Sequence, residues 1–144
     1  MKYDNIIKYF ESDTGVTELL NDLKVNYFDI IDDYAGQITQ EIITTSDELR
    51  TAKSALTGLY ASLQPIYSKA LTLKKQREYR YCVEHKEDGS ASFVDKAAKD
   101  NVRIYRDIRD LLCGYLKATE SLIYDCKDRI EQNRNEYHRT KEEN

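Results

Sequence analysis

The sequence predicts an all-α protein, built on one long antiparallel helical hairpin with coiled-coil-like packing and preceded by short amphipathic helices. Hydrophobic residues make up 40% and charged residues 33% of the chain, with one Pro and five Gly, a balance typical of helix-rich proteins with much exposed surface. Two long segments carry apolar residues at alternating spacings of three and four. One clear turn separates these segments, and a short turn between two long helices makes them antiparallel neighbours.

The length of 144 residues predicts a single helical domain. We divide it into acidic N-terminal helices over residues 1–45, a hairpin over 46–137 and a tail over 138–144 that should fray. No apolar run approaches the roughly 18–20 residues that a membrane span needs, and "MKYDNIIKYFESD" lacks the apolar centre of a signal peptide. We therefore expect a cytoplasmic protein that does not use a membrane as its partner.

The N-terminal region contains two apolar periodicities. One is "NIIKYF" at residues 5–10, and the other is "VTELLNDLKVNYFDIIDDYAGQI" at residues 16–38, where leucine, isoleucine and tyrosine recur at helical spacing. Asp29, Asp32 and Asp33 fall on or beside the polar side of the second helix. A metal cluster is one interpretation, but an acidic solvent face is the commoner one and no EF-hand spacing is present. Gly36 marks a weak point of this helix.

The first arm of the hairpin starts at Thr45, which has capping-box spacing to Glu48. Pro65 interrupts the apolar stripe and should kink or break the helix, because an interior proline removes a backbone hydrogen bond. The stripe itself consists of Leu49, Ala52, Leu56, Leu59, Leu63, Ile66, Ala70 and Leu73.

The second arm follows the turn "HKEDGSASF", so the hairpin tip should lie at about residues 85–92. Ser92 and Asp95 have the spacing of another capping box, and we expect one long helix from residue 94 to 137. In the antiparallel register, Leu56 should meet Leu122. The stripe of the second arm is Ala98, Val102, Tyr105, Ile108, Leu112, Tyr115, Thr119, Leu122, Cys126 and Ile130.

Arms of this length predict self-association. At 1.5 Å per residue each arm would span about 55 Å. The 45 residues before the hairpin can cover only part of such a surface, so we expect a homo-oligomer.

Charge is distributed unevenly along the chain. Residues 1–48 carry three cations and eleven carboxylates, whereas residues 49–144 carry nineteen cations and fifteen carboxylates. Just before the tip, the stretch "LKKQREYRY" at residues 73–81 is strongly basic, and the apolar stripe gives way to cations there. From Lys69 to Arg109 there are eleven cations and seven carboxylates, so pairing within the hairpin cannot neutralise all of them.

Two interpretations of this basic stretch stay open. It is either a solvated helix face with salt bridges between the arms, or a surface that binds an anionic polymer. Tyrosines among lysines and arginines suit single-stranded nucleic acid, whose bases stack while its phosphates meet the cations. The candidate nucleic-acid-binding residues are Lys74, Lys75, Arg77, Tyr79, Arg80, Tyr81, Lys96, Lys99 and Arg103.

The sequence offers little for an enzyme, a metal or a cofactor. It contains no Gly-rich phosphate loop, no GxSxG and no HExxH. Cys82, Cys113 and Cys126 form no CxxC and have no histidine at ligand spacing, which indicates reduced, structural cysteines rather than zinc ligands. We expect a non-enzymatic protein without cofactors.

The basic, tyrosine-containing "LKKQREYRY", the charged Gly-containing tip and the return "VDKAAKDNVRIYRDIRDLLCGYLKATESLI" together resemble the UvsY-like recombination mediators of tailed phages, over about residues 56–137. The resemblance implies a protein that forms ring-like oligomers, binds single-stranded DNA and helps a RecA-like recombinase to displace single-strand-binding protein in an infected bacterial cell. It implies that Lys74, Lys75, Arg77 and Arg80 contact the DNA.

The acidic N-terminal region departs from this family pattern and suggests an alternative. The chain would then be a helical protein-interaction module, such as a phage or mobile-element inhibitor or an assembly chaperone, that binds a basic protein. Its candidate partner-binding residues are Asp22, Asp29, Asp32 and Asp33.

Overall fold

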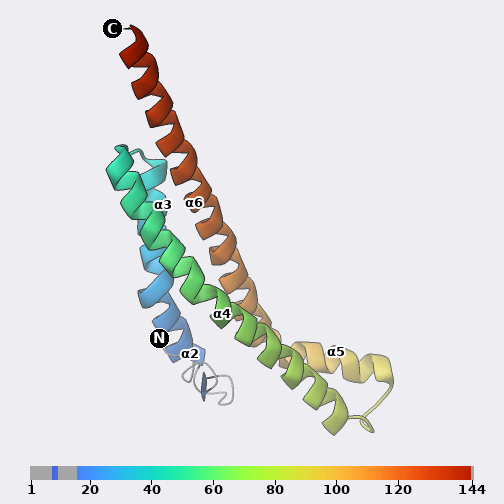
Figure 1. The fold of residues 1–144 in the computed structure, drawn as a ribbon. Helices are drawn as coiled ribbons and strands as arrows, with labels where there is room; N and C mark the ends of the chain where they lie inside the picture. The colour runs from blue at the N-terminus through green and yellow to red at the C-terminus, as the bar shows by residue number, and fades with distance from the viewer. Residues whose placement is uncertain (1–7, 10–15, 144) are drawn as a thin grey trace. The chain divides into compact units, whose positions relative to one another are not determined.

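The computed structural model describes residues 8–9 and 16–143, and helix covers 90% of them (Figure 1). These described residues contain no β-strand, which confirms the predicted all-α class. None of the helices in these ranges is long and apolar enough to cross a membrane. The predicted helix at residues 5–10 lies outside the described residues except for Lys8 and Tyr9.

The N-terminal segment is less regular than the single helix predicted for residues 16–38. Helix α2 (Val16–Leu23) passes into a π-helical segment (Lys24–Phe28), and α3 (Asp29–Thr39) follows. The wider π turn places two neighbouring aromatic residues, Tyr27 and Phe28, in buried positions. Gly36 lies inside α3 without ending it, and its carbonyl accepts a hydrogen bond from Gln40 N–H at 3.0 Å.

Helix α4 (Ser46–Glu84) begins at the predicted cap. The Thr45 hydroxyl accepts a hydrogen bond from Glu48 N–H at 3.2 Å and donates one to the Glu48 carboxylate at 2.9 Å. The first of these bonds satisfies an otherwise free N–H of the first turn, and the second orients the hydroxyl that accepts it. Pro65 lies inside α4 and does not end it, so the helix is not broken at the proline.

The return arm starts earlier than predicted. Ser90, not Ser92, caps α5 (Ala91–Asn101), because the Ser90 hydroxyl accepts a hydrogen bond from Phe93 N–H at 3.2 Å. Ser90 directly follows the turn glycine, Gly89, so the chain can enter the helix as soon as the turn is complete.

The return arm also consists of two helices, α5 and α6 (Arg103–Glu143), where one was predicted. The break is at the buried Val102, whose backbone leaves the regular helix at φ −97° and ψ 14°. The last carbonyls of a helix lack helical donors. Arg106 donates to one of them, the Lys99 carbonyl, at 2.8 Å, and this bond stabilises the break. At its other end α6 continues to Glu143, through the tail that we expected to fray.

The chain divides into two compact units, and both hairpin arms contribute to each of them. Unit 1 comprises residues 1–23 and 64–114, and unit 2 comprises residues 24–63 and 115–144. Each unit therefore pairs part of α4 with part of the return arm.

The core of unit 2 follows the predicted stripes. Its buried cluster consists of Ile38, Leu49, Ala52, Leu56 and Cys126, against which Leu122 and other partly buried residues pack. Leu56 and Leu122 thus share one cluster, as the antiparallel register predicted. Burial also raises the pKa of the Cys126 thiol, which is the behaviour of a structural cysteine.

The core of unit 1 combines α4 with α5, α6 and α2. Its larger buried residues on the arms are Ile66, Val94, Val102, Tyr105, Ile108 and Leu112, and Leu19 and Leu23 are buried on α2. Antiparallel pairing is seen here as well: Tyr67 of α4 lies beside Cys113 of α6, and Arg77 of α4 lies over the ring of Tyr105, 4.8 Å from its centroid.

Candidate nucleic-acid interface

All nine predicted nucleic-acid-binding residues lie in unit 1. They differ in how far their side chains are already engaged. Lys75, Arg80, Lys96 and Arg103 are exposed and form no ion pair with another described residue. Among the residues that the structure describes, no carboxylate competes with an external anion for these four cations.

Three other cations have partners within the unit. Lys74 bonds to Glu78 at 3.0 Å, and only 14% of its side chain is exposed. Lys99 pairs with Asp95 at 3.1 Å one turn earlier on α5. Arg77 is half-buried over Tyr105, a cation–π arrangement that fixes the direction of its guanidinium.

Arg80 lies between two hollows of the surface. The first, of about 380 Å³, is polar and joins α4 to the end of α5. Its lining consists of Arg77, Arg80, Tyr81, Glu84, His85 and Asn101. The second, of about 450 Å³, lies along α4 alone and is lined by Gln76, Tyr79, Arg80 and Val83.

The end of α4 holds the polar hollow in shape through local contacts. The rings of Tyr81 and His85 stack with centroids 4.1 Å apart, and His85 Nδ1 lies 2.6 Å from an Asp88 carboxylate oxygen. These contacts connect the last turn of α4 to the hairpin turn, so Tyr81 presents a fixed wall to the hollow.

The second hollow exposes an aromatic ring. Tyr79 is 73% exposed, and Val83, one turn later, is also exposed. Residues 76, 79, 80 and 83 share one face of α4 because they are spaced by three and four. A ring in the open beside an arginine can stack on a base while the guanidinium meets a phosphate.

Only some of the predicted nucleic-acid-binding residues line the two hollows. Arg77, Tyr79, Arg80 and Tyr81 line one hollow or the other. Lys75, Lys96 and Arg103 line neither of them; they are exposed residues of α4, α5 and α6. They would add a diffuse positive potential around the hollows rather than a shaped contact.

The acidic residues of the alternative interpretation are largely engaged within the chain. Asp22 accepts a hydrogen bond from the Tyr9 hydroxyl, and Asp32 accepts one from the Tyr115 hydroxyl, both at 3.0 Å. Asp29 pairs with Lys24 at 3.0 Å, while Asp33 is exposed. Burial and then the Asp32 carboxylate raise the pKa of Tyr115.

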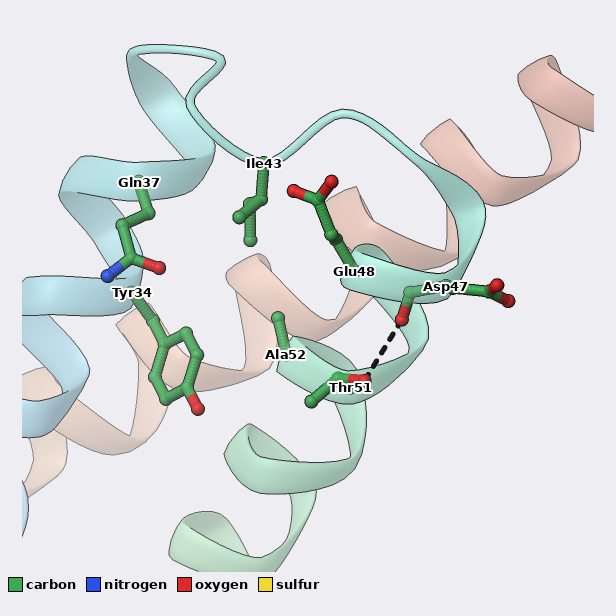
Figure 2. A pocket seen from close by; sticks show the side chains of 7 residues that line it. All are labelled: Tyr34, Gln37, Ile43, Asp47, Glu48, Thr51 and Ala52. Carbon is green, nitrogen blue, oxygen red and sulfur yellow. Dashed lines mark hydrogen bonds between the residues drawn. The ribbon is translucent and has the colours of Figure 1, made fainter.

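The sequence patterns did not indicate a third hollow, which lies in unit 2 where α3 and the start of α4 meet (Figure 2). Its volume is about 400 Å³. Glu48, one of its lining residues, stood out in the sequence only as a helix cap. The lining residues are Tyr34, Gln37, Ile43, Asp47, Glu48, Thr51 and Ala52.

Within residues 8–9 and 16–143, no three His, Cys, Asp or Glu side chains gather closely enough to hold a metal ion. Comparison of the chain with protein-family models, with curated proteins and with solved structures gave no match.

Proposed function

We propose that this chain is a non-enzymatic protein that binds single-stranded DNA through the surface around Arg80. The observation that carries the proposal is the position of Arg80 between a polar hollow, lined by two arginines together with the Glu84 carboxylate, and a hollow with an exposed tyrosine. A single strand offers alternating phosphates and bases, and the two hollows offer a matching pair of environments.

The shape of the surface favours a single strand over a duplex. In a duplex the base faces are stacked on one another, so an exposed ring such as Tyr79 could not stack on a base. In a single strand the base faces are free, and stacking on an aromatic ring contributes about 1–3 kcal/mol per base.

The resemblance to UvsY-like mediators gives the wider role that we propose. The chain would act as a homo-oligomer, cover single-stranded DNA and assist a RecA-like recombinase in an infected bacterial cell. An oligomer would repeat the Arg80 surface, so that contacts which are individually weak would together bind one DNA strand more tightly. No cofactor is needed for such a role.

The test is equilibrium binding of a fluorescein-labelled oligothymidylate, followed by anisotropy over a series of salt concentrations. The wild type should bind at low salt and weaken steeply as salt rises. Arg80→Ala should reduce the log–log salt slope by about 0.7 for each copy that contacts a phosphate.

The matched control is Arg134→Ala, which removes an exposed arginine of α6 in unit 2. It has the same change of charge but lies outside the proposed surface, so its slope and affinity should equal those of the wild type. Absence of binding by the wild type at low salt, or equal losses for the two variants, would overturn the proposal.

A further inference from the structure

The hollow in unit 2 is lined by residues that are not among the proposed DNA contacts. Its floor and one wall are apolar: Ala52 is buried, and Tyr34 and Ile43 are half-buried and pack against the core cluster of unit 2. Around this apolar part lie an amide, a hydroxyl and two carboxylates, from Gln37, Thr51, Asp47 and Glu48.

Figure 2 shows how these groups face one another. Ala52 lies in the middle, with Tyr34 and Gln37 of α3 on one side and Glu48 of α4 on the other, and Ile43 enters from the connection between the helices. The Asp47 side chain extends away from the others, so Glu48 supplies the carboxylate nearest to the hollow.

Glu48 keeps its negative charge available. Its carboxylate accepts a hydrogen bond from the neutral Thr45 hydroxyl at 2.9 Å, and it forms no ion pair with a described residue. The Asp47 carboxylate, by contrast, forms an ion pair with the Arg50 guanidinium, with a distance of 3.0 Å between oxygen and nitrogen. The surrounding segment is also acidic, since residues 24–48 carry one lysine and six carboxylates.

An apolar pocket with a carboxylate at its rim fits a side chain that is apolar along its stem and cationic at its end. Among the natural side chains, arginine satisfies the whole lining best. Its planar guanidinium can form a two-pronged hydrogen bond to a carboxylate, which the compact ammonium of lysine cannot do.

We propose that this hollow binds an arginine side chain presented by a basic segment of another protein. The stem would lie against Tyr34 and across Ile43 and Ala52, and the guanidinium at its end would bond to Glu48 on the far side of the hollow. This proposal does not depend on DNA binding, because the hollow and the Arg80 surface belong to different units. It also moves the site of a basic partner away from Asp22, Asp29 and Asp32, which hold contacts within the chain.

The probe is a short acetylated and amidated alanine peptide with one central arginine, titrated into the isotope-labelled protein and followed by amide NMR shifts. The control peptide carries citrulline at the same place, which has the shape of arginine without its charge. The arginine peptide should shift the amides of Tyr34, Gln37, Ile43 and Thr51 in a saturable way. The citrulline peptide should bind at least about tenfold more weakly, as expected for loss of a charged pair.

The decisive variant is Glu48→Gln, because glutamine also suits the capping position and keeps the helix start intact. It should weaken the arginine peptide about tenfold, to the level of the citrulline peptide. Glu120→Gln, an exposed carboxylate of α6 in the same unit, should leave binding unchanged. Amide shifts outside the hollow must stay the same in Glu48→Gln, which shows that the fold is preserved.

Several results would overturn the proposal. These are equal binding of the two peptides, equal binding by wild type and Glu48→Gln, or a lysine peptide that binds as well as the arginine peptide. A fourth is a wild-type oligomer that is lost in Glu48→Gln, measured by sedimentation, since the hollow would then be occupied by a second copy of this chain.

Discussion

The carboxylates of residues 22–33 and the cations of residues 75–103 are two strongly charged regions that use their charges differently. In the acidic region, Asp22, Asp29 and Asp32 each bond to a side chain of the same chain. In the basic region, Lys75, Arg80, Lys96 and Arg103 are exposed without an ion pair to a described residue. Three of the four acidic residues thus bond within the chain, whereas these four cations have no ionic partner among the described residues.

The difference teaches that a count of charges along a sequence does not identify an interaction surface. Residues 1–48 have the larger imbalance, three cations against eleven carboxylates, yet three of their four predicted partner-binding carboxylates bond within the chain, and the charged residues without an ion pair that line a hollow include Arg80 and Glu48. An interaction surface is identified by whether each charged side chain has a partner within reach in the same chain. The predictions below test this contrast by removing contacts from one region and observing the other.

The largest effect on stability should come from the core of unit 2. Leu56→Ala empties a fully buried position of the cluster and should lower the free energy of unfolding by about 3 kcal/mol, measured by urea denaturation. Val83→Ala, at an exposed position of α4, should change it by less than about 0.5 kcal/mol. A loss of similar size in both variants would contradict the assignment of the core.

The next largest effect should be on DNA binding. Arg80→Glu replaces attraction to a phosphate by repulsion and should weaken oligothymidylate binding by about 2 kcal/mol at low salt, with almost no change in stability. Asp33→Lys, a reversal at an exposed carboxylate of the acidic region, should not weaken it. If Arg80→Glu lowered stability as much as binding, Arg80 would belong with the structural charges.

A smaller effect should follow from removing a charge that serves the fold. Arg129 donates to the Ile38 carbonyl at 2.7 Å, across the core of unit 2. Arg129→Ala should cost about 1 kcal/mol of unfolding free energy, because the Ile38 carbonyl loses this donor and keeps the longer bond from Glu41 N–H at 3.2 Å. DNA binding should stay the same, and Arg134→Ala should change neither quantity.

The smallest effect should be a loss of stability at alkaline pH. Folding raises the pKa of Tyr115 above its usual value of 10.0, first through burial and then through the Asp32 carboxylate. The stabilisation that comes from the protonated Tyr115 hydroxyl is therefore complete below pH 10. It is lost as the pH rises through the raised pKa, because Tyr115 ionises more readily in the unfolded chain. Tyr115→Phe keeps the ring that stacks on Phe28 at 4.0 Å and should show a shallower decline, measured by urea denaturation over a pH series. A steeper decline in the variant would contradict the role of the hydroxyl.

Much of the fold could be predicted from the sequence, because periodicity reports burial directly. Leu49, Leu56, Leu63, Ile108 and Leu112 are buried as their spacing predicted. The break at Val102 could not be predicted, since it depends on Arg106 reaching back to the Lys99 carbonyl, a contact that forms only in the folded chain. The π-helical segment at Lys24–Phe28 likewise leaves no sequence pattern that we used.

The candidate site was predicted only in part. The basic stretch before the tip was evident from residue types, but the sequence could not show that Lys74 is turned toward Glu78 and nearly covered. The hollow at Glu48 was missed altogether, because its lining comes from two helices and a connection whose relation is set by packing. Its one sequence signal, Thr45 followed by Glu48, was explained by capping alone.

The central claim, that single-stranded DNA lies on the surface around Arg80, is tested most directly by photo-crosslinking. A single strand containing bromodeoxyuridine is irradiated in complex with the protein, and the crosslinked peptides are identified by mass spectrometry. The prediction is a crosslink to Tyr79 on α4, and none to Tyr124, which is 58% exposed on α6 in unit 2 and serves as an internal control. A crosslink to Tyr124 without one to Tyr79 would contradict the claim.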